Sequence, residues 1–456
     1  MLQRLIAIAM GRGGDYADLF FEYSSLDEMQ LRDRKVNSVG QHIDYGVGIR
    51  VLKGEQTGYA YSESTEWDKM AKAAATAAAI ADGSIQAPCP VSVTDVRHAS
   101  YYPAEDSWAN FDSSKRIEYL QWMNDLLFEL DGRITNVMES LTSSFERTLF
   151  FNSLGELAQD CGPMSSLAVS IVAKEGDRRE TASMSRSFRM GSEFLTEELM
   201  SAMASEVVSK CSMLFTAGTI KGGEMPVIMG AGGSGILLHE AIGHAFEADF
   251  IRKGTSIFTD SLGKKICSEK ISVVDDGTIP FNRGSINIDD EGVPSQKTYM
   301  VTNGVLTSFL HDRVSAKHYG VAPTGNGRRE SFRFNPIPRM RATYMENGDA
   351  TKDDIIASVK KGVFLDTFSN GQVQIGAGDF TFYVKSGWLI KDGKLTQPLK
   401  DINVIGNGPQ ALADIIEVAD DCIIDNGKWT CGKEQYCPVS CGMPTVLVSK
   451  LSVGGI

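Results

Sequence analysis

The sequence predicts an α+β protein, with duplicated N-terminal α/β subdomains followed by a β-rich, barrel-like C-terminal domain. Two successions of extended segments, each followed by a helix, fill the first half of the chain, and this order is typical of duplicated subdomains. From Met225 onward, alternating apolar segments separated by glycine turns predominate, which favours antiparallel strands. We therefore expect an N-terminal domain over residues 1–222 and a C-terminal domain over residues 223–456.

Each N-terminal copy begins with a strand-like segment, at residues 16–25 in the first and 134–151 in the second. A further extended segment with a polar turn follows in both copies. Each copy then enters a helix, near Thr65 in the first and near Leu195 in the second. A helix over residues 113–130 is expected to link them.

A short sequence match also favours the duplication. The segment Asn37-Ser38-Val39-Gly40-Gln41 returns later as Asn152-Ser153-Leu154-Gly155-Glu156. Self-similarity of this kind is a signature of repeated units.

The C-terminal region begins with a short buried strand, a glycine loop and a helix over residues 235–250. Asn303-Gly304 and Asp392-Gly393 have the composition of two-residue hairpin turns. We expect mostly antiparallel strands in a closed or half-closed barrel, interrupted by a helix from Asp353. The expected strands lie at residues 226–230, 271–276, 285–290, 297–310, 372–397 and 445–455.

Composition excludes several classes of function. The formal net charge is −13 over 456 residues, the wrong sign for direct, non-specific binding of nucleic acid. No apolar segment reaches the roughly 18 residues that a membrane span requires, and we interpret the N-terminal segment as an amphipathic helix rather than a signal. Eight cysteines, mostly scattered, indicate a reduced, cytoplasmic protein in which some thiols act as metal ligands.

The residues most informative about function are His239, Glu240 and His244, in the order His-Glu-x-x-x-His. Two imidazoles that bracket a carboxylate provide nitrogens for a metal ion and a base for the proton of a metal-activated water. On a regular helix, residues five apart point about 140° away from each other. A π-type turn, which closes residue i to i+5, would bring the imidazoles together, and Gly243 is a place where the helix could deform. We therefore predict a π turn or a broken turn between the histidines.

The glycine loop before this helix allows two interpretations. Gly230-x-Gly232-x-x-Gly235 formally matches a dinucleotide-binding fingerprint, but no parallel strand with an acidic end follows at the right distance. The alternative is that the glycines allow close backbone packing, or that the loop's amides, at Gly232 and Gly233, hold a peptide carbonyl near the metal. A dinucleotide enzyme is therefore kept as a minor alternative.

A catalytic zinc site needs a third protein ligand, and spacing alone leaves several candidates. They are His311, His318, Glu247, Asp249, Cys431, Cys437 and Cys441. The adjacent Arg328 and Arg329 lie in a glycine-rich loop and suit a carboxylate or a backbone carbonyl of a substrate, although a solvated turn is the more common reason for such a pair.

The chain resembles the TldD/PmbA (TldE) zinc metallopeptidase family, once described as modulators of DNA gyrase, and in particular its TldD subunit. The resemblance extends over nearly the whole chain and is densest after Gly230. The segments that carry it, in order, are HEAIGHAFEADF, RKGTSIF, VVDDGT, IDDEGVP, PTGNGRRES, NGQVQI, NGKWTCGKE and the final SVGG.

The resemblance implies a metal site and a mode of action. It implies zinc held by His239, His244 and Cys431, with Glu240 as general base close to the metal but not bound to it. It also implies a PmbA/TldE-type partner subunit and cleavage of unfolded peptides in a sequestered cavity. The additional Cys437 and Cys441 depart from the family pattern, and either could compete for the metal or form a disulfide with Cys431.

The function that the sequence predicts is therefore a zinc-dependent peptidase that acts on extended peptides, alone as a homodimer or with a partner subunit. The alternative is a non-catalytic peptide-binding or scaffold subunit of the same fold. Because a binder of unrelated peptides depends on main-chain hydrogen bonds, we also expect an unpaired strand edge near the metal.

Overall fold

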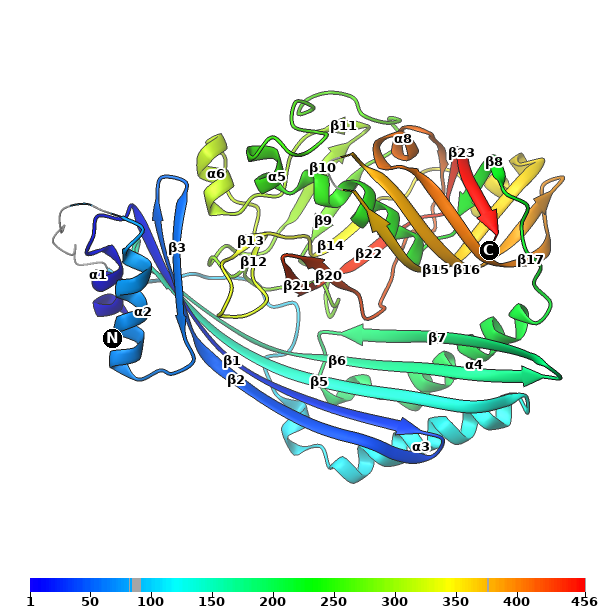
Figure 1. Cartoon of the computed structure of the whole chain (residues 1–456), viewed down its shortest axis with the longest axis horizontal. Helices are drawn as coiled ribbons and strands as arrows, with labels where there is room; N and C mark the ends of the chain where they lie inside the picture. Colours follow the sequence, from blue (N-terminus) through cyan, green and yellow to red (C-terminus); the bar gives the residue numbers. More distant parts are fainter. Residues whose placement is uncertain (82, 84–91, 375–376, 456) are drawn as a thin grey trace.

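The computed structural model describes residues 1–81, 83, 92–374 and 377–455. Its N-terminal half is built on one long, curved, seven-stranded sheet, and its C-terminal half lies over one face of that sheet (Figure 1). None of the helices in these ranges combines the length and the apolar character needed to span a bilayer.

The N-terminal sheet has the strand order β3-β2-β1-β5-β6, with β4 and β7 also paired to β6. Its strands are β1 (Tyr16–Arg32), β2 (Lys35–Lys53), β3 (Gln56–Ser62), β4 (Thr94–Asp95), β5 (Ile134–Asn152), β6 (Glu156–Glu175) and β7 (Arg178–Phe188). The helices of this half are α1 (Leu2–Met10), α2 (Trp67–Ala78), α3 (Ser113–Leu130) and α4 (Glu197–Leu214).

The predicted duplication is confirmed at the level of topology. Strands β1, β2 and β3 followed by α2 match β5, β6 and β7 followed by α4, and the two halves join where β1 pairs antiparallel with β5. The short sequence match does not align these halves, however. Residues 37–41 lie within β2, whereas residues 152–156 span the turn between β5 and β6. That local match is therefore a coincidence, because equivalent residues of a repeat occupy equivalent places.

Helices α3 and α4 bury their apolar faces against β5, β6 and β7. Leu120, Met123 and Leu127 of α3 share one core with Leu167 and Val169 of β6. Asp112 accepts a hydrogen bond from the backbone N–H of Ser114 at the start of α3, which caps the helix where the sequence predicts that it begins. The long sheet thus has one face covered by helices and the other turned toward the C-terminal half.

The C-terminal half contains a closed barrel, as predicted. Its strands follow the order β17-β16-β15-β8-β23, and a further pairing between β17 and β23 closes the ring. A separate six-stranded sheet has the order β11-β10-β9-β14-β22-β19, and two short hairpins, β12–β13 and β20–β21, stand apart. The division of the chain at residues 222 and 223 stays a prediction.

The elements of this half follow one another along the chain as a mixture of strands and short helices. They are β8 (Gly223–Met229), α5 (Ala248–Arg252), β9 (Val273–Asp276), β10 (Lys297–Thr302), β11 (Val305–Leu306), α6 (Arg313–Tyr319), β12 (Gly327–Arg328), β13 (Ile337–Pro338), β14 (Ala342–Met345), α7 (Lys352–Ser358), β15 (Lys361–Val373), β16 (Asp379–Lys391), β17 (Lys394–Asn407), α8 (Gly408–Ala413), β18 (Ile415–Val418), β19 (Ile423–Ile424), β20 (Thr430–Lys433), β21 (Gln435–Pro438), β22 (Ser440–Met443) and β23 (Val446–Gly455).

Both predicted hairpin turns are present. Asn303 and Gly304 have φ angles of 47° and 80°, and Asp392 and Gly393 have φ angles of 50° and 74°. Two consecutive residues with positive φ are what a type I′ turn requires, so these dipeptides fix the β10–β11 and β16–β17 registers.

The expected strand over residues 285–290 is wrong. Only a single bridge, from Ile288 to Pro294, forms in this segment. The Asp289 carboxylate accepts hydrogen bonds from the backbone N–H groups of Glu291 and Val293. These side-chain bonds replace a strand ladder with a tight turn.

A buried charge cluster joins the two halves. Arg50 of β2 donates to Asp18 of β1 and, at 2.6 Å, to Glu291 of the C-terminal half, and the Arg50 and Glu291 side chains are fully buried. Arg313 adds a hydrogen bond to the Glu291 carbonyl. Because an unpaired buried charge is strongly destabilising, this contact fixes how the C-terminal half sits on the sheet.

Glu139 of β5 provides a test of the core under the sheet. Its carboxyl is fully buried and accepts a hydrogen bond from Asn124 of α3. Burial raises its pKa to about 8, so the folded state favours the protonated form. The stability that depends on this proton is complete below the ordinary pKa of 4.5 and is lost as the pH rises through 8.

We therefore expect Glu139→Gln to raise the free energy of unfolding at pH 9 by on the order of 3 kcal/mol and to change it little at pH 4. Denaturant titrations of both proteins at the two pH values measure this difference. Equal stabilisation at both pH values would contradict the assigned cause.

Candidate metal centre

The helix predicted over residues 235–250 is broken into four short pieces, and one of them is a π helix. Single-turn 3₁₀ helices span Gly233–Gly235 and His244–Phe246, a π helix spans Leu238–Gly243, and α5 follows. The backbone N–H of His244 donates to the carbonyl of His239, which is the i+5 to i bond of a π turn. The predicted π turn between the two histidines is therefore confirmed.

Gly243 has a packing reason to be glycine. A Cβ at this position would lie 2.3 Å from the Met340 sulfur, so any side chain would push the turn away from the neighbouring chain. The same turn is buried on this side. The glycine thus lets the π turn pack closely, with both imidazoles aimed the same way.

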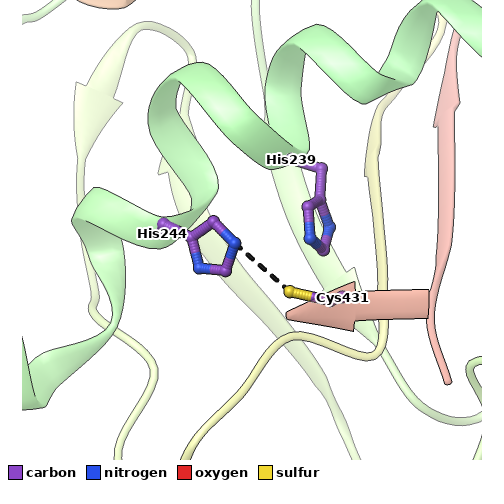
Figure 2. A group of neighbouring side chains, drawn as sticks. All are labelled: His239, His244 and Cys431. Atoms are coloured by element: carbon purple, nitrogen blue, oxygen red, sulfur yellow. Dashed lines mark hydrogen bonds between the residues drawn. The ribbon is translucent and has the colours of Figure 1, made fainter. Parts of the chain in front are cut away.

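The two imidazoles and the Cys431 thiol converge on one point (Figure 2). The imidazole rings lie 5.0 Å apart at an angle of 81°. The Cys431 sulfur, on strand β20, lies 3.2 Å from Nε2 of His244. The potential ligand atoms of the three residues all lie within 4.8 Å of one another, and all three side chains are buried.

This arrangement fits a metal ion better than it fits a set of protein hydrogen bonds. Both ring nitrogens of His239 are buried and, among the described residues, have no hydrogen-bond partner. Buried polar atoms are rarely left without a partner. In a tetrahedral zinc site, ligand atoms stand about 3.5 Å apart, which lies within the observed spread. Two imidazoles and one thiolate also form a donor set that zinc prefers.

Electrostatics favours the metal-binding form of the thiol. Burial alone would raise the pKa of Cys431, but the neighbouring imidazoles of His239 and His244 outweigh it and lower that pKa to about 4. Burial would lower the pKa of His244, but Glu247 and Cys431 outweigh it and raise it to about 10. Without metal, the site therefore holds a thiolate beside an imidazolium at neutral pH.

Glu247 does not join the ligand group. Its Oε2 lies 2.8 Å from Nδ1 of His244, on the side of the ring opposite the Cys431 sulfur. This contact leaves Nε2 of His244 directed at the converging atoms. Burial would raise the pKa of Glu247, yet Lys433 and His244 lower it to about 2, so the carboxylate is ionised. No motif in the sequence marks Lys433 beyond its position two residues after Cys431.

The other candidate ligands lie outside the group of three, as far as the described chain goes. Cys437 stands opposite Cys431 in the β20–β21 hairpin, and its sulfur accepts a hydrogen bond from Nη1 of Arg339 at 3.5 Å. Cys441 lies in β22. His311 lies near Phe309 and Tyr319, while His318 contacts Glu55. Asp249 accepts a bond from Lys433 at 2.7 Å.

Glu240 is half-buried beside His239, and no hydrogen bond or ion pair to its carboxylate occurs among the residues described. It also lies outside the group of three ligands. Its assignment as general base stays a prediction.

At two positions in the glycine loop, close packing leaves no room for a side chain. A Cβ on Gly235 would lie 2.5 Å from the backbone of Gly442, and one on Gly230 would lie 2.8 Å from the ring of Phe364. Gly232 has a φ of 91°, and Cβ atoms on Gly232 and Gly233 would meet nothing closer than 3.5 Å and 3.8 Å. These two glycines therefore lie in ordinary contact with the side chains of Ile423 and Asp425, with Gly232 buried and Gly233 half-buried.

Arg328 and Arg329 both make contacts within the fold. Arg328 donates to the Met340 carbonyl at 2.7 Å. Arg329 donates to the Asp290 carbonyl and lies over the ring of Phe20. Both guanidinium groups are buried. Their suggested role in binding substrate stays a prediction.

A cavity of about 620 Å³ lies between the long sheet and the barrel. Strands β5, β6 and β7 line one side, and β15 and β16 line the other. Asp425, Lys428 and Trp429 also line it. Trp429 stands two residues before Cys431, roughly 7 Å along an extended chain. Asp425 adjoins Gly233, so this wall reaches the glycine loop, whereas His239, Glu240, His244 and Cys431 are not among the described residues that line the cavity.

Family models match the chain in three successive parts. They are described as PmbA/TldA metallopeptidase domain 1 at residues 17–81, central domain at residues 106–214 and C-terminal domain at residues 222–455. A metalloprotease TldD homolog of Haemophilus influenzae is 38% identical, with 100% of this chain and 96% of the relative covered. A zinc metalloprotease TldD homolog of Saccharolobus solfataricus is 28% identical, with 97% of each covered.

The crystal structure of TldE from Thermococcus kodakarensis has the same fold, with a TM-score of 0.79 over 99% of both chains and 22% identity. At that identity the likeness concerns the fold alone. The matches to the family models and to the Haemophilus relative go further, because they span the whole chain. The chain belongs to the PmbA/TldD family of metallopeptidases.

Proposed function

We propose that the chain is a zinc-dependent peptidase in which His239, His244 and Cys431 hold the metal. The observation that carries the proposal is the convergence of three buried ligand atoms within 4.8 Å, together with the unpartnered ring nitrogens of His239. The Saccharolobus relative is named a zinc metalloprotease, which supports zinc over other metals.

Zinc at this position would supply Lewis-acid polarisation of the scissile carbonyl and a water of lowered pKa. The chain's own residues then handle the proton and the substrate. Glu240 accepts the proton of the attacking water and returns it to the leaving amine. The half-buried Gly233, which carries no side chain of its own, allows a peptide backbone to approach closely.

We propose that the substrate is an extended, unfolded peptide held by main-chain hydrogen bonds. Two strands that lie at the edges of their sheets border the glycine loop and the cavity. They are β19, beside Gly232, and β7, along the cavity. Strand β19 has two residues, whereas β7 has 11. Figure 1 shows β7 at the edge of its sheet, facing the barrel. The longer edge is the better support for an added peptide strand.

The pattern of hydrogen bonds identifies the groups that this edge offers. The backbone N–H of Ser187 donates to the Asn426 carbonyl, away from β6. Because alternate residues of an antiparallel pair face the same way, Thr181, Ser183 and Ser185 direct their backbone groups to the same side. A peptide paired with them would run toward residues 425–429, and so toward Cys431.

We further propose that a second chain closes the cavity, either a PmbA/TldE-type partner or another copy of this one, in the cytoplasm. The fold shared with TldE supports a partner of similar shape. If the chain binds peptides without cleaving them, alone and with such a partner, the scaffold alternative holds instead.

The general-base role of Glu240 is tested by Glu240→Gln. We expect this change to leave zinc content unchanged and to lower peptide hydrolysis by roughly 10²- to 10⁴-fold, the usual contribution of a positioned base. Cys431→Ser is the matched control, because it should lower zinc content instead. Full activity in Glu240→Gln would rule out the assigned role.

Metal affinity should depend on pH in a defined way. Between about pH 5 and pH 9 the metal-free site carries a Cys431 thiolate and a His244 imidazolium, because their pKa values are about 4 and about 10. Zinc must displace the proton from His244, so the apparent affinity should rise about tenfold per pH unit over this range. Competition with a chelator of known protonation measures the slope. A flat profile would contradict the assignment of a thiolate and an imidazolium to the metal-free site.

The β7 edge is tested by Ser183→Pro. Proline removes an outward-facing N–H without removing a bond to β6. We expect a loss of about two- to tenfold in kcat/KM for unstructured peptides, the value of one hydrogen bond, with zinc content unchanged. Ser183→Ala, which keeps the N–H, should behave like wild type. Equal activity of the proline and alanine variants would argue against strand addition at β7.

A further inference from the structure

We infer that Lys433 and Glu247 form a positioning pair that joins the histidine-bearing turn to the cysteine-bearing hairpin, so that metal affinity depends on two residues that do not touch the metal. The inference rests on the metal site proposed above. It concerns how that site is assembled from segments far apart in the sequence.

On the histidine side, the Lys433–Glu247 pair acts on His244. Its Nδ1 lies 2.8 Å from Oε2 of Glu247, which fixes both the ring orientation and the nitrogen that remains free. The same Oε2 lies 3.1 Å from Nζ of Lys433. One carboxylate oxygen therefore links an imidazole of the π turn to a side chain of strand β20.

On the cysteine side, the same pair acts on the strand that carries Cys431. Alternate residues of a strand share a face, and burial in β20 alternates so that Cys431 and Lys433 are buried while Thr430 and Gly432 are exposed. The ammonium that contacts Glu247 thus lies on the same face of the hairpin as the thiol. A shift of this strand would move both groups together.

Lys433 is held from several sides. Its Nζ lies 2.7 Å from Oδ1 of Asp249 and 3.1 Å from the Pro338 carbonyl, and it stands 4.4 Å from the centre of the Phe250 ring. Only 5% of the residue is exposed. Because a buried ammonium is stable only with such partners, these contacts determine one position for the side chain.

A second buried cation holds the hairpin itself. The guanidinium of Arg339 donates to the carbonyls of Cys431 and Gln435, both at 2.7 Å. It thereby bridges β20 and β21 and fixes the strand that carries the thiol. Arg339 sets the shape of the hairpin, whereas Lys433 sets its distance from the histidines. The two cations thus have separate tasks.

Removing one member of the pair should therefore disturb the metal ligands. Without the Lys433 ammonium, Glu247 and Asp249 are two buried carboxylates without a common partner, and Glu247 loses the contact that aims it at His244. Without the Glu247 charge, the ammonium keeps Asp249 as its one ion-pair partner among the described residues and no longer connects to the imidazole. Both changes loosen the same link.

The experiment measures cobalt(II) and zinc affinity of the full-length chain by competition with a chelator at fixed pH. The variants are Glu247→Gln, Lys433→Met, Lys433→Arg and the double variant Glu247→Gln with Lys433→Met. Lys400→Met is the matched control, since Lys400 also pairs with a carboxylate, that of Glu180, away from the ligand group. Absorption of bound cobalt(II) reports the thiolate contact and the ligand geometry independently of catalysis.

We expect Glu247→Gln and Lys433→Met each to lower metal affinity about 10- to 100-fold and to alter the cobalt spectrum. Lys433→Arg should recover part of the affinity, and Lys400→Met should match wild type. The double variant should lose less than the product of the two single losses, because both act on one link. It leaves one buried carboxylate, that of Asp249, without its ammonium partner, where Lys433→Met leaves two, and so covers the case in which Lys433→Met does not fold.

Folded Glu247→Gln and double variants with wild-type affinity and spectrum would overturn the inference while leaving the metal site intact. An equal loss in Lys400→Met would overturn it as well, since a general loss of packing would then explain the effect. A wild-type chain that binds neither metal would overturn the proposed site and this inference together.

Discussion

The π turn between His239 and His244 is the constraint on which the rest of the site depends. On a regular helix the two imidazoles would point about 140° apart, and no single ion could reach both. The i+5 hydrogen bond at His244 removes that separation, and Gly243 permits it by lying against Met340 without a side chain. The glycine loop, the β20–β21 hairpin and the buried cations are all arranged around this one deformation.

Neighbouring charges, which outweigh burial, give the site its chemical character. In water at neutral pH, a thiol and an imidazole are both mostly uncharged. In this site the thiolate and the imidazolium stabilise each other. The ionised Glu247 and Lys433 behind them extend the same pattern. Since each buried charge requires a partner, the metal-binding residues and their supports form one connected set that spans two distant parts of the sequence.

Local features of the chain were predictable from the sequence. The helix at Ser113–Leu130 has its capping residue, and the Asn303-Gly304 and Asp392-Gly393 turns have dipeptides that tolerate two positive φ angles. The π turn followed from the spacing of two histidines. The strand expected at residues 285–290 does not form, because the Asp289 carboxylate accepts hydrogen bonds from nearby backbone N–H groups. The alternation of apolar residues does not reveal this competing interaction.

Long-range partners were not predictable in the same way. Lys433, Arg339 and Glu247 are ordinary charged residues until folding brings residues 247, 339 and 433 to one place. The third ligand was ambiguous on spacing alone, and only the resemblance to a family singled out Cys431. The short match between the segments at Asn37 and Asn152 was misleading in turn, because the two segments resemble each other in sequence but occupy different places in the two repeats.

The proposed metal site is tested most directly by anomalous scattering at the zinc edge from crystals of the full-length chain grown with zinc. We predict one strong peak, at about 2.0–2.3 Å from a ring nitrogen of His239, Nε2 of His244 and Sγ of Cys431, with Glu240 close by but not bonded. A zinc peak at other residues, or no peak at this point in zinc-loaded crystals, would contradict the site.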